Sequence, residues 1–226
     1  AGIVQMSGSI AGNTHARNRF GNYIRPRTKP VNPHSDGQEN ARAIVSYLAE
    51  KWHAPIMDPW RGSWNTYAAA VAMKNRLGET IHLTGFNHFI RSNVPKLKVG
   101  LSEKHNAPSI LSLPEKDHIL ECTEEDIAKQ EFTFICSLNG WEADGDPKYY
   151  IFIYQGQPQL KSRNFFDGPW RFMDQINADA GKQGTDDLRA SFAFAEGQKV
   201  WFQARLLTVS GRLTQRWTLA PKIIVK

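Results

Sequence analysis

The sequence is poor in cysteine, with only Cys122 and Cys136 among its 226 residues. Two cysteines do not make the disulfide framework of a small secreted domain, and whether they pair is left open. No run of about 18 apolar residues is present, so we expect no membrane-spanning helix. The first twenty residues lack a charged segment followed by an apolar one. We therefore expect no signal peptide within the chain and leave open one removed before Ala1.

Motifs of catalysis and cofactor binding are also missing. The chain has no G-x-S-x-G, P-loop or G-x-G-x-x-G stretch, and no H-E-x-x-H pair among its seven histidines. The carboxylates of Asp144 and Asp146 flank a glycine without the spacing of an EF-hand, and we interpret this run as a hairpin turn. The sequence therefore predicts a protein that is not an enzyme, with no cofactor and no metal site.

Apolar and aromatic residues are plentiful. Hydrophobic residues make up 41% of the chain, and 7 Trp, 12 Phe and 6 Tyr supply material for a core. This composition excludes a disordered chain and is ordinary for a globular protein.

Charge is distributed unevenly along the chain. Residues 1–100 carry 13 basic and 5 acidic residues, whereas residues 101–226 carry 15 basic and 17 acidic ones. The first 35 residues contain no carboxylate; their basic residues are Arg17, Arg19, Arg25, Arg27 and Lys29. Such an asymmetry is typical of contact with nucleic acid or an acidic protein surface, and equally of a solvated arm. No RRM, zinc-finger or helix-turn-helix signature favours base recognition.

Residues 1–33 are predicted to form an extended basic arm. Tyr23 and Ile24 lie between arginines in a strand-like stretch, and three prolines make the following residues extended and stiff. Because large apolar side chains are few here, the arm cannot build a core of its own. It is expected to lie on the rest of the protein or on a neighbouring molecule.

Residues 34–108 are predicted to be helical. The end signals place one helix from about Gly37 to Pro55, one from Asp58 to the C-cap Gly78, and one from Thr84 to Pro95. Two of the apolar faces carry tryptophan. We interpret them as a helix–helix core, with an aromatic ligand platform as the less favoured alternative.

Residues 109–226 are predicted to be rich in strands. Alternating apolar residues mark six to seven short strands, including those near 132–137, 149–154, 192–194, 200–205, 206–209, 213–219 and 222–226. Residues 157–177 are expected to form a long loop or an edge excursion of the sheet, and the pair Asp186-Asp187 to lie in a loop. Glu124, Glu125 and Asp126 are expected in a helical turn or linker. The predicted fold class is α+β: the arm, the small helical region and an antiparallel β-sandwich like those of immunoglobulin or fibronectin type III domains.

Two groups of residues in this last region are candidates for binding. Glu124, Glu125 and Asp126 are carboxylates that can meet the basic arm of another copy. Four aromatic residues are candidates for holding a glycan or receptor: Trp141, Phe165, Phe166 and Trp170. For these aromatic residues core packing is the favoured alternative.

Several motifs occur in a characteristic order. They are the basic stretch R-P-R-T-K-P-V-N-P at 25–33, tryptophan-bearing helices, and G-F-N-H-F-I at 85–90. Over residues 7–95 the chain resembles a family of uncharacterised bacterial and phage proteins. Because that family has no known function, the resemblance predicts no particular activity for this chain. Residues 130–226 resemble an immunoglobulin or fibronectin type III sandwich without the Cys…Trp…Cys core of antibody domains. Such modules are common in virions and extracellular assemblies, an association at the level of fold.

The sequence therefore predicts a structural protein that self-assembles, exchanging its arm between copies. The expected partners are copies of itself and other virion or filament proteins. The expected location is a virion or extracellular assembly, after cytoplasmic synthesis if no signal peptide was removed. The alternative is a binding module, which takes nucleic acid through the arm or a glycan or receptor through the sandwich.

Overall fold

The computed structural model describes residues 7–18, 21–29, 31–75, 77–114, 120–137, 148–179 and 183–225. The chain divides into two compact units, Ala1–Asn40 and Ala41–Lys226. The boundary falls within helix α1 (Asp36–His53), whereas the sequence predicts boundaries near residues 33 and 108. Three main helices and antiparallel sheets confirm the α+β class.

The first unit contains a small antiparallel sheet of its own. Strands β1 (Gly8–Ile10), β2 (Asn13–Asn18) and β3 (Gly21–Pro26) pair in the order β1-β2-β3. The predicted strand-like stretch is therefore extended, but its strands pair with one another. Gly21 has a φ of 119°, a conformation that residues with a Cβ rarely adopt, and it begins β3. Gly21 thus marks the start of the returning strand.

The helical part of the second unit contains α1, a single turn η1 (Pro55–Met57), α2 (Asp58–Ala70) and α3 (Gly85–Lys98). Thr84 caps α3 as predicted, since its Oγ1 accepts a hydrogen bond from the Asn87 N–H at 3.2 Å. In contrast to the prediction, α3 continues past Pro95 to Lys98. Proline lacks only one backbone donor, and the packing of the helix compensates for that loss.

The predicted extent of the second helix is wrong. It ends at Ala70, and the next residues form a hairpin of β4 (Ala72–Lys74) and β5 (Thr80–His82). Gly78, with a φ of 81°, lies in the turn of this hairpin. Glycine adopts a positive φ both at helix ends and in tight turns. The presence of Gly78 therefore indicated a change of chain direction but did not distinguish a helix end from a hairpin turn.

The remaining strands form three antiparallel sheets in a sandwich-like arrangement. One has the order β11-β7-β6, with β6 at Glu121–Asp126, β7 at Glu131–Ser137 and β11 at Gln183–Arg189. The second has the order β10-β8-β13-β14, with β8 at Lys148–Gly156, β10 at Trp170–Asp179, β13 at Phe202–Thr208 and β14 at Trp217–Thr218. The third has the order β15-β12-β9, with β9 at Gln159–Leu160, β12 at Gln198–Val200 and β15 at Lys222–Ile223.

Several polar segments form strands that local sequence did not predict. Glu124, Glu125 and Asp126 lie in β6 and not in a helical turn, and Asp186 and Asp187 lie in β11 and not in a loop. Much of the expected loop 157–177 belongs to β9 and β10, whereas 192–194 is not a strand. Each polar strand is aligned by an apolar neighbour, because β11 pairs along the whole of β7 and β6 pairs with β7 from Glu131 to Ile135. Pairing with a strong strand therefore overrides weak local propensity.

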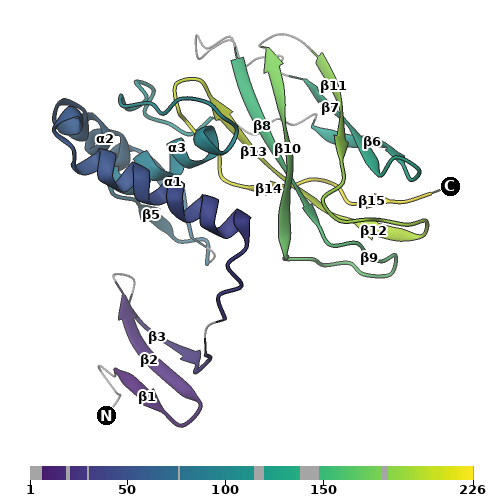
Figure 1. Ribbon diagram of the computed structural model, residues 1–226, viewed down its shortest axis with the longest axis horizontal. Helices are drawn as coiled ribbons and strands as arrows, with labels where there is room; N and C mark the ends of the chain where they lie inside the picture. The colour runs from purple at the N-terminus through teal and green to yellow at the C-terminus, as the bar shows by residue number, and fades with distance from the viewer. Residues whose placement is uncertain are drawn as a thin grey trace. The chain divides into compact units, whose positions relative to one another are not determined.

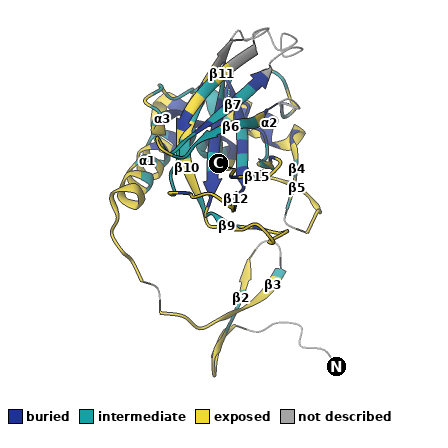
Figure 2. Ribbon diagram, turned by 90° about the vertical axis from the view of Figure 1, so that its right-hand side faces the viewer, coloured by how far each residue is buried: buried dark blue, intermediate teal, exposed yellow. Residues whose placement is uncertain are grey.

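The second unit is built around three apolar clusters. In the sandwich, the Phe202 ring packs on Phe132 and Phe134 with centroid distances of 4.9 and 5.1 Å. Among the helices, Trp52 and Trp64 pack on Phe89, which confirms the prediction of a tryptophan-bearing helix–helix core. A third cluster of Phe152, Leu207 and Leu213 joins Val99, just after α3, to the β8-β13 sheet. Figure 1 shows the helices gathered beside this sheet, and Figure 2 shows buried residues along its strands.

Candidate functional site

The sheet of the first unit carries apolar and basic side chains on its surface. The register places Ile10, His15, Arg17 and Ile24 on one face, and Tyr23 and Arg25 on the other. Ile24 is 64% exposed, and none of the residues that the structure describes in this unit is buried (Figure 2). A three-stranded sheet needs a covered apolar face to be stable, so this face is a candidate for contact with another molecule.

The predicted basic residues belong to this surface. Arg17, Arg25, Arg27 and Lys29 are all exposed, and Arg19 lies outside the described residues. No carboxylate occurs before Asp36, so the charge of this sheet is uniformly positive. Tyr23 and Ile24, predicted as contact residues together, are placed on opposite faces because they are neighbours in one strand.

An acidic groove lies on the second unit. It has a volume of about 500 Å³ and is lined by β6, β7, β11 and the C-terminal segment. Its carboxylates are Glu124, Glu125, Asp126, Glu131 and Asp187, accompanied by a single lysine, Lys129. The register aligns Glu124, Thr133 and Asp187 across the three strands, which explains why residues distant in sequence share one groove.

Some carboxylates of the acidic groove already form ion pairs or hydrogen bonds within the chain, and others do not. Glu125 is 6% exposed, and its Oε2 lies 2.8 Å from Lys222 Nζ while its Oε1 accepts a hydrogen bond from the Val225 N–H. Asp126 accepts a hydrogen bond from the Lys129 N–H, and this bond holds the pKa of Asp126 below its usual range. Of the three predicted carboxylates, only Glu124 is exposed without an ion-pair partner among the described residues.

Two further carboxylates, which sequence reasoning missed, complete the groove. Asp187 is exposed and accepts a hydrogen bond from Thr133 Oγ1 at 2.6 Å, and Glu131 lies opposite Asp126 on the neighbouring strand. Like charges directly opposite each other destabilise a sheet. The groove therefore favours a cationic partner, and no signal in the local sequence pointed to this pairing.

The predicted aromatic surface is not assembled. Phe166 is buried, stacked on Trp201 at 5.5 Å and in edge contact with Trp170 at 5.0 Å. The burial of Phe166 agrees with core packing, the favoured alternative, because Trp170 and the more distant Trp201 cover its ring. Phe165 is 73% exposed, and Trp141 lies outside the described residues.

The thiols and histidines suggest no reactive centre. No disulfide joins Cys122 to Cys136, and burial raises the pKa of the Cys122 thiol to about 12, which keeps it protonated at neutral pH. Within the described ranges, no group of three or more His, Cys, Asp or Glu residues is placed to hold a metal ion. In the same part of the chain, no helix is long and apolar enough to cross a membrane.

Comparisons with known proteins identify no relative of this chain, so the proposals below depend on its own residues. No protein-family model, curated protein or solved structure matches it. The resemblance to bacterial and phage proteins therefore stays a prediction.

Proposed function

We propose that the chain is a non-enzymatic structural protein that assembles with copies of itself. In this proposal the first unit of one copy docks on the acidic groove of the next. The observation that carries the proposal is the absence of any buried residue among those described in the first unit, although Ile10, Tyr23 and Ile24 are available to be covered. Burial of such side chains is worth about 1.5–3 kcal/mol each.

Charge complementarity supports the acidic groove as the receiving surface. Arg17 and Arg25 are exposed cations, and Glu124, Glu131 and Asp187 are the groove carboxylates without an ion-pair partner among the described residues. Strand β6 is an edge strand of its sheet, so a strand of another copy can pair with its free edge. Such a contact uses different surfaces on the two copies, so it repeats as a ring or a filament.

The form of the assembly is part of the proposal. It is a component of a virion or of an extracellular filament, with a second unit of the immunoglobulin or fibronectin type III kind. The support is the sandwich-like set of antiparallel sheets, a fold-level association.

Light scattering and electron microscopy test this function. We expect the full chain to form rings or filaments, and Ile24→Asp and the double variant Arg17→Glu/Arg25→Glu to disperse into monomers. Lys161→Glu, which reverses one positive charge at an exposed residue outside both surfaces, is the control and assembles normally. Mixing the arm variant with Glu124→Lys/Asp187→Lys should restore mixed assemblies. A wild-type chain that stays monomeric at high concentration contradicts the proposal, as does unchanged assembly of the arm variants.

The exposed cations of the first unit favour one alternative, the binding of nucleic acid. Each phosphate contact releases counterions, so binding would weaken steeply with salt. Filter binding of labelled DNA at several salt concentrations tests this alternative, and a flat salt response contradicts it.

A further inference from the structure

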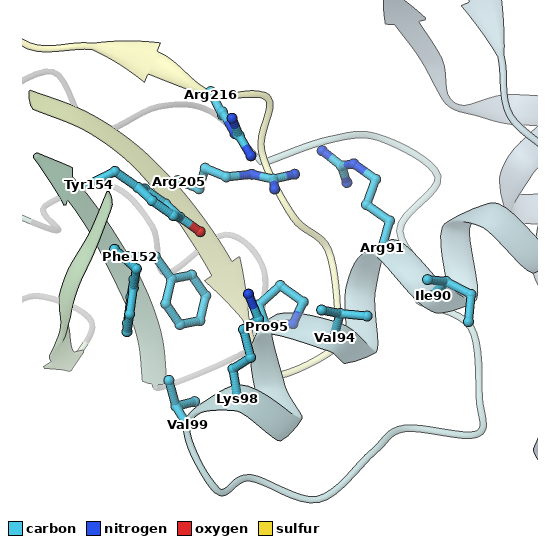
Figure 3. A pocket seen from close by; sticks show the side chains of 11 residues that line it. Ile90, Arg91, Val94, Pro95, Lys98, Val99, Phe152, Tyr154, Arg205 and Arg216 are labelled. Carbon is cyan, nitrogen blue, oxygen red and sulfur yellow. The ribbon is translucent and has the colours of Figure 1, made fainter. Parts of the chain in front are cut away.

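A second pocket in the second unit has the opposite charge. It has a volume of about 320 Å³ and lies between α3 and strands β8, β10 and β13. Four cationic side chains line it: Arg91, Lys98, Arg205 and Arg216. None of the residues described at its wall is acidic. Figure 3 shows Arg91, Arg205 and Arg216 turned toward one another at one end of the pocket.

Two of these arginines are partly removed from water without full compensation. Arg91 Nη2 donates a hydrogen bond to the Thr214 carbonyl at 2.6 Å, but Arg91 Nη1 and Arg205 Nε are buried without a partner among the described residues. Burial and, to a smaller extent, the nearby charge of Arg205 together lower the pKa of Arg91 to about 9. Burial likewise lowers the pKa of Arg205 to about 10. Both stay charged at neutral pH, so their mutual repulsion is not relieved by loss of a proton.

The rest of the pocket is aromatic and apolar. The Phe172 ring meets Tyr154 at 5.6 Å in an edge contact, and it is 38% exposed. The guanidinium of Arg216 lies 5.5 Å from the centre of the Tyr154 ring. Val94, Pro95 and Val99 complete the wall. A ligand here would thus meet the guanidinium groups together with the rings of Tyr154 and Phe172.

We propose that this pocket binds an organic phosphate of mononucleotide size. The phosphate lies among Arg91, Arg205 and Arg216, and the planar ring of the ligand lies against Tyr154 and Phe172. Guanidinium groups bind phosphate with two parallel hydrogen bonds, and a dianion offsets the repulsion among three cations. Aromatic side chains stack on bases. The volume is at the lower end for ligand pockets, which suits one nucleotide better than a dinucleotide.

Calorimetry on the full chain tests this site with AMP, adenosine and inorganic phosphate. We expect AMP to bind and each fragment to bind at least about tenfold more weakly, because each makes only half of the contacts. Arg205→Met should weaken AMP binding by about 10- to 100-fold, the usual loss for a hydrogen bond to a charged group. Arg163→Met removes a guanidinium that is not at the pocket wall and should leave binding unchanged.

Two additional variants keep the test decisive. Arg216 is exposed, so Arg216→Met is expected to fold normally even if Arg205→Met does not. Tyr154→Leu should weaken AMP while leaving inorganic phosphate unaffected. The proposal is overturned if AMP binds no more tightly than phosphate, or if Arg216→Met and Tyr154→Leu bind AMP like the wild type.

The phosphate group bound in this pocket could belong to a free nucleotide or to the 5′ end of a nucleic-acid strand. Oligothymidylate with and without a 5′-phosphate distinguishes them. A terminal site predicts stronger binding of the phosphorylated strand, lost in Arg216→Met. A site for a free nucleotide predicts that AMP binds and that the terminal phosphate changes nothing. If neither AMP nor the phosphorylated strand binds, the proposal is wrong, and self-assembly is unaffected because it uses other residues.

Discussion

The two units contain the same antiparallel pairing but differ completely in burial. In the first, three strands are fully registered, yet none of its described residues is buried. In the second, strands of similar length carry Phe132, Phe134 and Phe202 into one core with exposures of 0%. Hydrogen-bonded pairing determines where strands form, but it does not supply a core. A core requires a second layer of apolar side chains, which the first unit lacks within itself.

The second unit shows how burial also changes the role of charge. The exposed pair His34–Glu39 of the first unit is surrounded by water, whereas Glu125 and Lys222 meet where Glu125 is 6% exposed. Arg91 and Arg205 of the cationic pocket are half-buried, with no carboxylate at the pocket wall. In the second unit a buried carboxylate is therefore matched by a lysine of the same chain, whereas the half-buried arginines are the groups that we propose meet a ligand.

The largest effect should come from truncating a core ring. Phe202→Ala is expected to lower the free energy of unfolding by about 3–5 kcal/mol, since a cavity is left between Phe132 and Phe134. Ile24→Ala in the first unit should change it by less than about 0.5 kcal/mol in the unassembled chain, because that side chain is exposed there. Urea unfolding measures both. Equal losses in the two variants would contradict the contrast between the units.

A pH titration of stability should show a second effect confined to the second unit. Burial, with smaller contributions from the charges of Arg91 and His82, lowers the pKa of His88 from 6.5 to about 4. Between these values the unfolded chain binds a proton that the folded chain does not. The free energy of unfolding is therefore highest above pH 6.5, where His88 is neutral in both states. It falls by about 3 kcal/mol as the pH drops to 4, because only the unfolded chain takes up the proton. His88→Phe should flatten the unfolding free energy in this window, and an unchanged slope would exclude His88 as its source.

Breaking the buried ion pair should have a smaller effect. Glu125→Gln leaves Lys222 beside a neutral group and is expected to cost about 1–2 kcal/mol. Glu39→Gln, at the exposed pair of the first unit, should change stability by less than about 0.5 kcal/mol. Thermal unfolding at matched salt compares them. If the exposed pair proved equally important, burial would not be the controlling variable.

The smallest effect tests a local signal. Thr84→Ala removes the cap of α3 and should cost about 1 kcal/mol. Thr66→Ala is the control, because its exposed hydroxyl donates to the Gly62 carbonyl within α2 and caps nothing. Circular dichroism during urea unfolding reports both. A loss for Thr66→Ala as large as for Thr84→Ala would show that the cap has no special role.

Features with strong local signals were predictable. The cap at Thr84, the helix beginning near Asp36 and the strand cores of β7 and β8 follow from caps and alternation of apolar residues. The polar strands β6 and β11 were not, because their conformation depends on pairing with β7. Gly78 was assigned to the wrong kind of turn, since the residue alone does not distinguish a helix end from a hairpin.

The candidate sites divide in the same way. The sequence by itself determined the basic, carboxylate-free first unit and the candidate carboxylates at 124–126, because composition needs no fold to be counted. Only the tertiary structure decided that Glu131 and Asp187 join Glu124 in one groove, and that Phe166 is covered by Trp201. It also brought Arg91, Arg205 and Arg216 to one pocket. The physical reason is that strand register and helix packing join residues that lie far apart in the chain, over separations at which local patterns carry no information.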